Sequence, residues 1–176
     1  MILGAVLAGG RSSRFGSDKA LAELGGDTLL ARAVDLLAPW CEDVVVVGRD
    51  SAPAPTIRDW PHADMGPLGG IAAALRHARE LELEAVLSIG VDAVGLPDDL
   101  PHLLSPAPAF LDSQPVIGLW PTTVLAAVER ILEGDDKHSM RALAAAIGAR
   151  AVKLGAEPAN INTPADLEAA EKHHGL

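Results

Sequence analysis

The 176-residue sequence contains no tyrosine, and aromatic residues make up only 3% of it. Aromatic side chains therefore cannot supply most of the core, which we expect to consist of alanine, valine, leucine and isoleucine. A chain of this length can bury a sizeable core. No change in composition divides it, so we expect a single domain over residues 1–176.

Cysteine is nearly absent as well, since Cys41 is the only one, and this excludes an intramolecular disulfide bond. We interpret Cys41 as a small, partly buried residue rather than a nucleophile. The N-terminus lacks the basic segment and long apolar stretch that are typical of a secretory signal. No apolar run reaches the length of a membrane span. We therefore expect a cytoplasmic protein.

Basic residues are scarce, with 14 Lys and Arg against 24 Asp and Glu and a formal net charge of −10. This balance argues against nucleic acid, or an anionic membrane surface, as the main partner. A small phosphorylated ligand is still compatible with the composition, because a few cations in one loop create a local field.

Such a loop follows the first apolar run. The run, Ile2–Leu7, predicts a central strand that is buried on both faces, and Gly9 and Gly10 come directly after it. Ligands of open α/β sheets bind at the carboxyl ends of the strands. Because glycine has no Cβ, a ligand can approach the backbone closely, and successive N–H groups form an anion-binding concavity.

Arg11, Arg14 and Lys19 add positive charge to this loop. Arginine suits two-pronged contact with phosphate, and lysine acts as a mobile point charge. The alternative is a solvated turn with ordinary surface charges, but three cations within nine residues of an acidic chain favour a phosphate site. The loop does not match the Walker A pattern, because Ser17 rather than Lys follows Gly16.

Apolar runs and helical periodicity alternate along the first hundred residues, which predicts a mostly parallel sheet with right-handed crossovers. From Pro106 onward the pattern is less regular, and a strand out of order there would give a mixed sheet. The expected strands are Ile2–Leu7, Val44–Val47, Thr56–Asp59, Ala85–Ile89, Pro115–Trp120 and Ala151–Leu154. Helices are expected to begin after Asp27 or Thr28, within Met65–Ile71, at Pro97, after Thr122, at Ser139 and at Pro164.

Asp92 follows the buried run Ala85–Ile89 and should therefore lie at the carboxyl end of that strand, near the glycine loop. One carboxylate together with substrate phosphates is the usual way in which proteins hold Mg²⁺. The alternative is an aspartate that caps a turn. Its place at the strand end makes Asp92 the candidate metal ligand.

Three segments match the motifs of a known family. Gly66–Gly70 is similar to a G-P-L-A-G loop, with Asp59 seven residues before it, and Asn160–Leu167 is similar to N-x-N-T-P-E-D-L. The first loop matches the signature L-A-G-G-x-S-x-R-x-G-x-D-K through Leu7, Ala8, Gly9, Gly10, Ser12, Arg14, Gly16, Asp18 and Lys19. The chain therefore resembles the molybdenum cofactor guanylyltransferases, within the nucleotidyltransferase superfamily.

The resemblance implies an α/β, Rossmann-like three-layer sandwich with a mostly parallel mixed sheet of the nucleotide-diphospho-sugar transferase type. Residues up to about 100 would bind nucleotide, and the remainder would bind the acceptor and provide a closing helix. The implied reaction transfers GMP from GTP to molybdopterin, forms molybdopterin guanine dinucleotide and releases pyrophosphate. Mg²⁺ is the implied cofactor, and other proteins of cofactor biosynthesis are the implied source of the pterin.

The resemblance also assigns roles to single residues. Arg14 and Lys19 would hold the triphosphate, and Asp92 the metal, as the catalytic set. Asn160 and Asn162 would approach the metal or the phosphates, although on bare physics Asn162 or Thr163 simply caps the last helix. The nucleotide-binding set is Leu7, Ala8, Gly9, Gly10, Arg11, Lys19, Asp59, Gly69 and Asp92, with Asp64 as an alternative to Asp59.

Three positions depart from the family pattern. Val94 replaces the proline of an Asp-x-Pro motif, and Gln114 replaces the histidine of a His-Pro pair. The segment Val46–Arg49 lacks the asparagine that the family often has near the nucleotide, and within it only Arg49 fits the family's loop. These departures leave two alternatives open. One is a cytidylyltransferase, or a transferase acting on another small phosphate. The other is a non-catalytic relative that binds nucleotide or cofactor.

Overall fold

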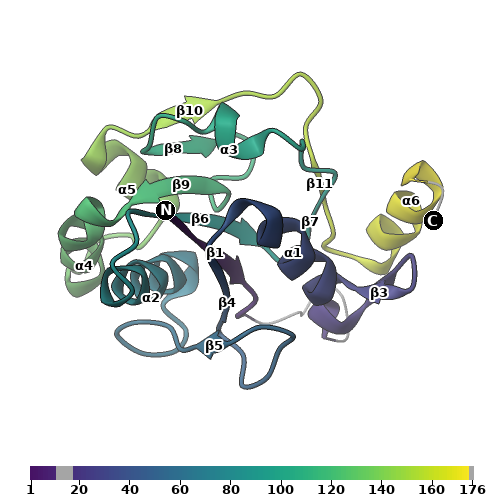
Figure 1. Cartoon of the computed structure of the whole chain (residues 1–176), viewed down its shortest axis with the longest axis horizontal. Helices are drawn as coiled ribbons and strands as arrows, with labels where there is room; N and C mark the ends of the chain where they lie inside the picture. The colour runs from purple at the N-terminus through teal and green to yellow at the C-terminus, as the bar shows by residue number, and fades with distance from the viewer. Residues whose placement is uncertain (11–17, 175–176) are drawn as a thin grey trace.

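The computed structural model describes residues 1–10 and 18–174, which form a three-layer α/β sandwich around a seven-stranded sheet (Figure 1). The strand order is β10-β8-β9-β6-β1-β4-β5, and only β9 runs antiparallel to its neighbours. The expected mixed, mostly parallel sheet is confirmed. The strands are β1 (Ile2–Leu7), β4 (Asp43–Val47), β5 (Thr56–Ile57), β6 (Ala85–Gly90), β8 (Ala109–Leu111), β9 (Gly118–Pro121) and β10 (Arg150–Val152).

Helices cover both faces of this sheet. In Figure 1, α1 lies on one side of the sheet, whereas α2, α4 and α5 lie on the other. The helices are α1 (Leu29–Leu37), α2 (Gly66–Glu80), α3 (Leu100–Leu103), α4 (Leu125–Glu133), α5 (Met140–Ile147) and α6 (Pro164–His174). Three short 3-10 turns are η1 (Lys19–Leu21), η2 (Ala38–Trp40) and η3 (Thr122–Val124). Two small ribbons pair β2 (Glu23–Leu24) with β3 (Asp27–Thr28) and β7 (Ala93–Val94) with β11 (Ala159–Asn160).

The core consists of two aliphatic layers, one on each face of the sheet. Side chains alternate along β1, so that Leu3 packs with the α2 layer and Val6 with the α1 layer. Trp120 is the one large exception to the expected aliphatic core among the fully buried side chains. Its indole Nε1 donates to Ser88 Oγ at 2.9 Å, and Ser88 Oγ donates to the carbonyl of Val116 at 2.6 Å. The only buried polar side chain in the described ranges is thereby satisfied.

Cys41 is partly buried, as predicted. Burial, with a smaller contribution from the Glu42 carboxylate, raises the pKa of the Cys41 thiol to about 12. The thiol therefore stays protonated at neutral pH, which does not favour a nucleophile. No helix in the described part of the chain is both long and apolar enough to cross a bilayer.

Local predictions held best where the signal was a cap or a buried run. Thr28 caps α1 by accepting a hydrogen bond from Ala31 N at 3.1 Å, and Pro164 opens α6. Thr122 was wrongly predicted to cap an α-helix. Its Oγ1 instead donates to the carbonyl of Glu84 at 3.2 Å, and η3 comes between it and α4.

Two further boundaries were wrong, and β8 was missed. The strand predicted from Pro115 begins only at Gly118, because the chain first turns back on itself, with Ile117 N donating to the Gln114 carbonyl at 2.9 Å. The helix predicted from Pro97 begins at Leu100. β8 has three residues and two prolines just before it, which is too short a run for periodicity to identify.

The sheet places the site by bringing three strand ends together. In the parallel register Leu7 lies beside Val47 on one side and beside Gly90 on the other. The loops that follow β1, β4 and β6 therefore leave the sheet at the same edge, where ligands of such sheets bind.

Candidate active site

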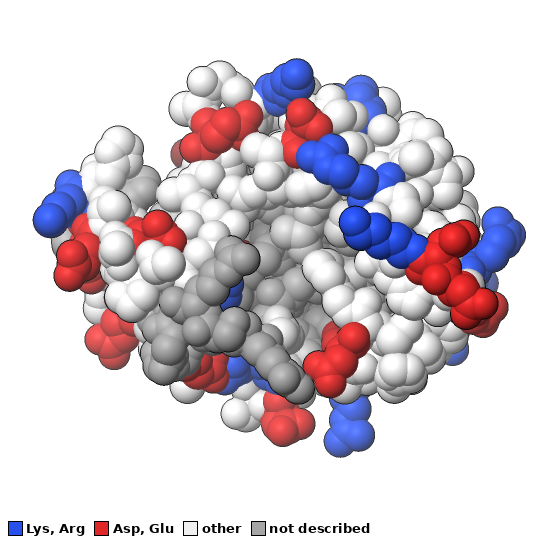
Figure 2. Space-filling model, turned by 180° about the vertical axis from the view of Figure 1, so that it is seen from behind, with Lys and Arg blue, Asp and Glu red and all other residues white. Residues whose placement is uncertain are grey.

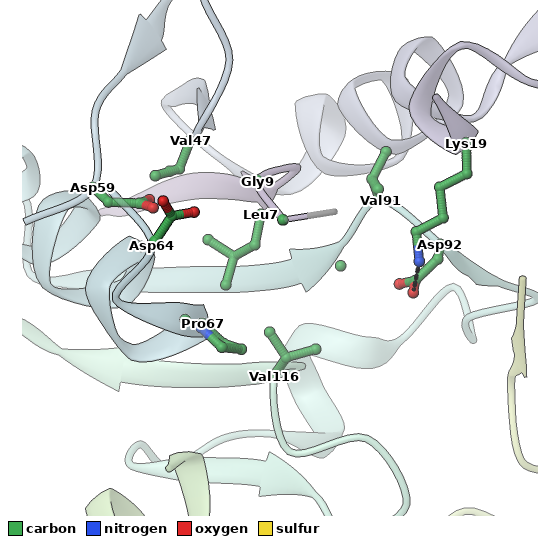
Figure 3. Close-up of a pocket in the computed structure, with 14 residues that line it drawn as sticks. Leu7, Gly9, Lys19, Val47, Asp59, Asp64, Pro67, Val91, Asp92 and Val116 are labelled. Carbon is green, nitrogen blue, oxygen red and sulfur yellow. Dashed lines mark hydrogen bonds and ion pairs between the residues drawn. The ribbon is translucent and has the colours of Figure 1, made fainter. Parts of the chain in front are cut away.

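A cavity of about 570 Å³ opens at this edge of the sheet. The hollow is visible on the face shown in Figure 2, where charged side chains gather mainly around the rim. Figure 3 shows its interior, with acidic side chains at both ends and an aliphatic middle. The lining residues are Leu7, Gly9, Gly10, Lys19, Val47, Asp59, Asp64, Gly66, Pro67, Gly70, Gly90, Val91, Asp92 and Val116.

Gly9, which lines the cavity, touches Gly48 from the neighbouring strand end. A Cβ on Gly48 would lie 2.7 Å from Gly9 Cα and 2.9 Å from Gly9 N, and Gly48 has a φ of +87°. Only glycine meets both conditions without strain. In addition, Ala8 N donates to the Val47 carbonyl at 3.0 Å. The start of the first loop is therefore seated directly on the segment that follows β4.

One end of the cavity holds a lysine and an aspartate in contact. Lys19 Nζ lies 2.9 Å from Asp92 Oδ2, and both side chains are about one-fifth exposed, at 23% and 20% (Figure 3). A Cβ on Gly90 would lie only 2.6 Å from Asp92 Oδ1, so the absence of a side chain at Gly90 makes room for this carboxylate. Asp92 thus lies at the end of β6 and in contact with Lys19, while its role as a metal ligand stays a prediction.

The opposite end holds Asp59 and Asp64, whose carboxylates lie near each other in Figure 3. Burial raises the pKa of Asp59, and the negative charge of Asp64 raises it further. Neither carboxylate makes a hydrogen bond or ion pair with the described residues. Asp59 is therefore a desolvated acceptor pointing into a cavity, a group that a ligand carrying hydrogen-bond donors would satisfy.

The C-terminal segment supports the loop that carries Asp92. Ile161 N donates to the Asp92 carbonyl at 2.9 Å, and β11 pairs with β7 immediately after this loop. The segment itself is fixed by Asp166, whose carboxylate accepts from Asn162 N at 2.9 Å and Thr163 N at 2.8 Å. These bonds, with one from Thr163 Oγ1, keep the pKa of Asp166 below its usual range.

The side chains at the cavity fit a metal ion that is coordinated partly by the protein and partly by oxygen atoms of a bound phosphate compound. The described residues contain no group of three or more His, Cys, Asp or Glu side chains that could hold a metal ion by themselves. Asp92, however, presents one carboxylate in a partly buried site beside a lysine. One carboxylate completed by substrate phosphate oxygens is compatible with Mg²⁺.

The cavity brings together six of the residues predicted from the sequence: Leu7, Gly9, Gly10, Lys19, Asp59 and Asp92. Arg11 and Arg14 lie outside the described residues. Four others do not line the cavity. Ala8 has its side chain in the core and its N–H bonded to Val47, and Gly69 is packed against Met65 and the Trp60 carbonyl. Asn160 and Asn162 flank the buried Ile161 and are not among the lining residues.

Several lining residues were not predicted. Val47, Gly90 and Val91 come from the ends of adjacent strands, and the predicted parallel pairing was the signal that could have identified them. Asp64 had been considered only as an alternative to Asp59. Val116 belongs to the turn before β9, and no local pattern indicates that this turn reaches the cavity.

Comparison with known proteins gives a consistent result. Residues 4–152 match the family model described as "MobA-like NTP transferase domain". A molybdenum cofactor guanylyltransferase of Acidiphilium cryptum is 37% identical, over 94% of this chain and 92% of the relative.

Solved structures share the fold. Molybdopterin-guanine dinucleotide biosynthesis protein A of Archaeoglobus fulgidus superposes with a TM-score of 0.72 at 24% identity, covering 98% of both chains. A CMP:2-keto-3-deoxy-manno-octonic acid synthetase in complex with CTP superposes with a TM-score of 0.73 at 14% identity, covering 99% of this chain and 98% of the other. The predicted nucleotide-diphospho-sugar transferase type of fold is confirmed.

Proposed function

This chain belongs to the MobA-like NTP transferase family, and from that premise we propose where on it the reaction takes place. Its reaction is the one for which its full-length relatives are named, the transfer of GMP from GTP to the molybdenum cofactor molybdopterin. A phosphate oxygen of the pterin attacks the α-phosphorus of GTP, and the bond to the leaving pyrophosphate breaks. The observation that carries the assignment is the cavity, which offers a cation and a metal-ligand candidate at one end and two carboxylates at the other.

The Lys19 end suits the triphosphate. Phosphoryl-type transfer needs little covalent help from protein side chains, so the site must align the reactants and neutralise charge. Lys19 supplies a mobile positive charge, and the backbone of Gly9 and Gly10 supplies close approach to the phosphates. Arg14, which carries the second catalytic charge of the matching motif, is proposed to act with Lys19.

Asp92 is the residue that would hold Mg²⁺, with the remaining positions taken by phosphate and water oxygens. When bound there, the ion would neutralise phosphate charge that builds up as pyrophosphate leaves. Because Lys19 contacts Asp92 in the described structure, nucleotide binding must share the lysine between that carboxylate and the phosphates. The Ile161 hydrogen bond to the Asp92 backbone would keep the carboxylate aimed at the cavity during this exchange.

The Asp59 end suits guanine. The edge of guanine carries two neighbouring donors, N1–H and N2–H₂, and a carboxylate can accept both. Cytosine presents a single donor group, N4–H₂, beside the acceptor N3, so a carboxylate that accepts from N4 faces a repulsive lone pair at N3. Leu7 and Pro67 supply apolar surface for the ring, and Gly70 leaves room beside them, since a Cβ there would lie 3.0 Å from Leu7 Cδ2. Asp59 is therefore proposed to select GTP over CTP.

The acceptor is proposed to enter from the second half of the chain, where Val116 lines the cavity. This assignment keeps the expected division into a nucleotide-binding part up to about residue 100 and an acceptor-binding part beyond it. Gln114, which replaces the family's histidine, lies in the same turn before β9 as Val116, and its Nε2 donates to the Pro158 carbonyl at 2.9 Å. We also propose that another protein of cofactor biosynthesis delivers the pterin to this side of the cavity.

The experiment that tests the function measures thermal stability with Mg²⁺ and each of GTP, CTP, ATP and UTP. A ligand that binds only the folded state adds about 2.7 kcal/mol at a hundredfold excess over its Kd. For a chain of this length we expect a rise in Tm of roughly 5–10 °C with GTP, lost when EDTA removes the metal. A larger shift with CTP would favour the cytidylyltransferase alternative, and the absence of pyrophosphate release on adding molybdopterin would favour the non-catalytic one.

We predict that Asp59→Asn makes the protein more stable at neutral pH while weakening its binding of GTP. The pKa of Asp59 is raised in the folded state, so the folded protein binds a proton at Asp59 more tightly than the unfolded chain does. At neutral pH, where Asp59 is ionised, its charge therefore destabilises the fold. Removing this charge should therefore raise Tm at pH 7. The gain should disappear as pH falls through the raised folded value towards the ordinary value near 3.8.

The same Asp59→Asn substitution should raise the Kd for GTP by about 10- to 100-fold, because a charged acceptor of two hydrogen bonds is lost. Unfolding curves from pH 3.5 to 8 and isothermal titration with GTP check both effects. Asp135→Asn, which removes an exposed carboxylate far along the chain, is the matched control and should change neither. Unaltered GTP affinity in the Asp59 variant would remove this residue from base recognition.

A further inference from the structure

We propose that Arg49 is a positioning residue, whose ion pair with Asp18 fixes the turn that carries Lys19 into the nucleotide site. This inference rests on the proposed function of Lys19. Arg49 follows β4, and Asp18 precedes η1, so the pair joins segments 31 residues apart in sequence. Arg49 does not belong to the described lining of the cavity, so its action would pass through Asp18.

The contact is two-pronged. Arg49 Nη1 donates to Asp18 Oδ1 at 3.0 Å, and Nη2 donates to Asp18 Oδ2 at 2.8 Å. Parallel bonds of this kind fix orientation as well as distance, which a single lysine–carboxylate contact cannot do. The pairing also lowers the pKa of Asp18, mainly through its hydrogen bonds with Arg49.

Asp18 transmits the constraint to the next residue. Its Oδ1 also accepts from Ala20 N at 3.2 Å, which caps the turn Lys19–Leu21. The carboxylate thus holds the backbone on the C-terminal side of Lys19 while Arg49 holds the carboxylate. Lys19 leaves this turn towards Asp92, 2.9 Å away.

The guanidinium of Arg49 is largely removed from water. Its side chain is 19% exposed, and its Nε is buried with no hydrogen-bond partner among the described residues. A guanidinium that has lost this much water is costly without a partner, and Asp18 is the one carboxylate that pairs with it in the part of the chain the structure describes. The preceding Gly48 packs on Gly9, so the same segment contacts the first loop at both Gly9 and Asp18.

If Arg49 acts by positioning Lys19, its replacement should matter only while Lys19 is present. If Arg49 contacts GTP directly, the loss should be the same with or without Lys19. The measurement is kcat/KM for GTP in the wild type, Arg49→Ala, Lys19→Ala and the double variant, with KM for molybdopterin determined in parallel. We expect Arg49→Ala to lower kcat/KM for GTP by roughly 10- to 100-fold, as a small displacement of a catalytic group does. In the Lys19→Ala background the same change should cost less than twofold, and KM for molybdopterin should not move.

Arg49→Lys tests the geometry, since it keeps the charge and loses the two-pronged contact. It should recover no more than part of the lost activity. Arg79→Ala, which removes an exposed arginine of α2, should behave as wild type. Circular dichroism melting of each variant shows whether the fold is intact, and Arg49→Lys serves for the comparison if Arg49→Ala does not fold.

Two results would overturn the proposal. An equal loss from Arg49→Ala with and without Lys19 would make Arg49 a direct contact of the nucleotide or a general structural residue. Wild-type activity in Arg49→Ala would leave the ion pair without a role in the reaction. Failure of the proposed function is a separate result, because then the wild type itself would neither bind GTP nor release pyrophosphate.

Discussion

Replacing Lys19 with alanine is expected to lower kcat for GMP transfer by about 10²- to 10³-fold, the usual effect of removing one group that stabilises developing charge. Lys19 Nζ is the cation that the described structure brings into the cavity, 2.9 Å from Asp92 Oδ2. In the transition state negative charge moves onto the leaving pyrophosphate. A positive charge at this end of the cavity attracts that negative charge more strongly than it would in bulk water. The measurement is pyrophosphate release at saturating GTP and molybdopterin.

The fold should tolerate this change. Partly exposed ion pairs contribute little to stability, typically about 0–1 kcal/mol, so Tm should fall by no more than roughly 4 °C. Lys172→Ala removes an exposed lysine of α6 and should leave both turnover and Tm at the wild-type values. If Lys19→Ala kept full turnover, the first loop would have no part in charge stabilisation, and the cavity would need another catalytic cation.

The parts of the fold that the sequence predicted are those specified by short stretches of chain. Ile2–Leu7 and Ala85–Ile89 are continuous apolar runs, as is typical of strands buried on both faces, and both strands were confirmed. The structure pairs them as parallel neighbours in the sheet. Because these strands are parallel, their carboxyl ends, and with them Asp92 and the glycine loop, lie at the same edge of the sheet. The candidate phosphate end of the site was therefore predictable without any knowledge of distant contacts.

The parts that the sequence could not predict depend on which distant segments meet. The turn before β9 brings Val116 to the cavity, and the Arg49–Asp18 pair links two loops, yet neither is marked by local periodicity. Matching a motif also fails to tell which way each residue faces. Ala8 and Gly69 lie inside matching motifs, but their backbone groups are bonded to Val47 and Trp60 and neither residue lines the cavity.

The contact between Gly48 and Gly9 leads to a second large effect, since Gly48→Ala should damage both stability and nucleotide binding. A non-glycine residue in left-handed backbone costs about 1–2 kcal/mol, and Gly48 has a φ of +87°. The added Cβ would also lie 2.7 Å from Gly9 Cα, a backbone atom that can move away only by displacing the loop. Overpacking of this kind costs typically a further 1–3 kcal/mol.

Gly26→Ala separates the two causes. Gly26 has a nearly identical φ of +91°, but nothing lies within 4 Å of its Cβ position, so its substitution reports backbone strain alone. We expect Gly26→Ala to lower stability by about 1–2 kcal/mol and to keep wild-type affinity for GTP. Gly48→Ala should lose more stability than this and about 100-fold in kcat/KM for GTP, because displacing Gly9 by about 1 Å misaligns the phosphate site. Urea unfolding and steady-state kinetics measure the two effects. Equal behaviour of the two variants would mean that the first loop binds nucleotide without being seated on the segment after β4.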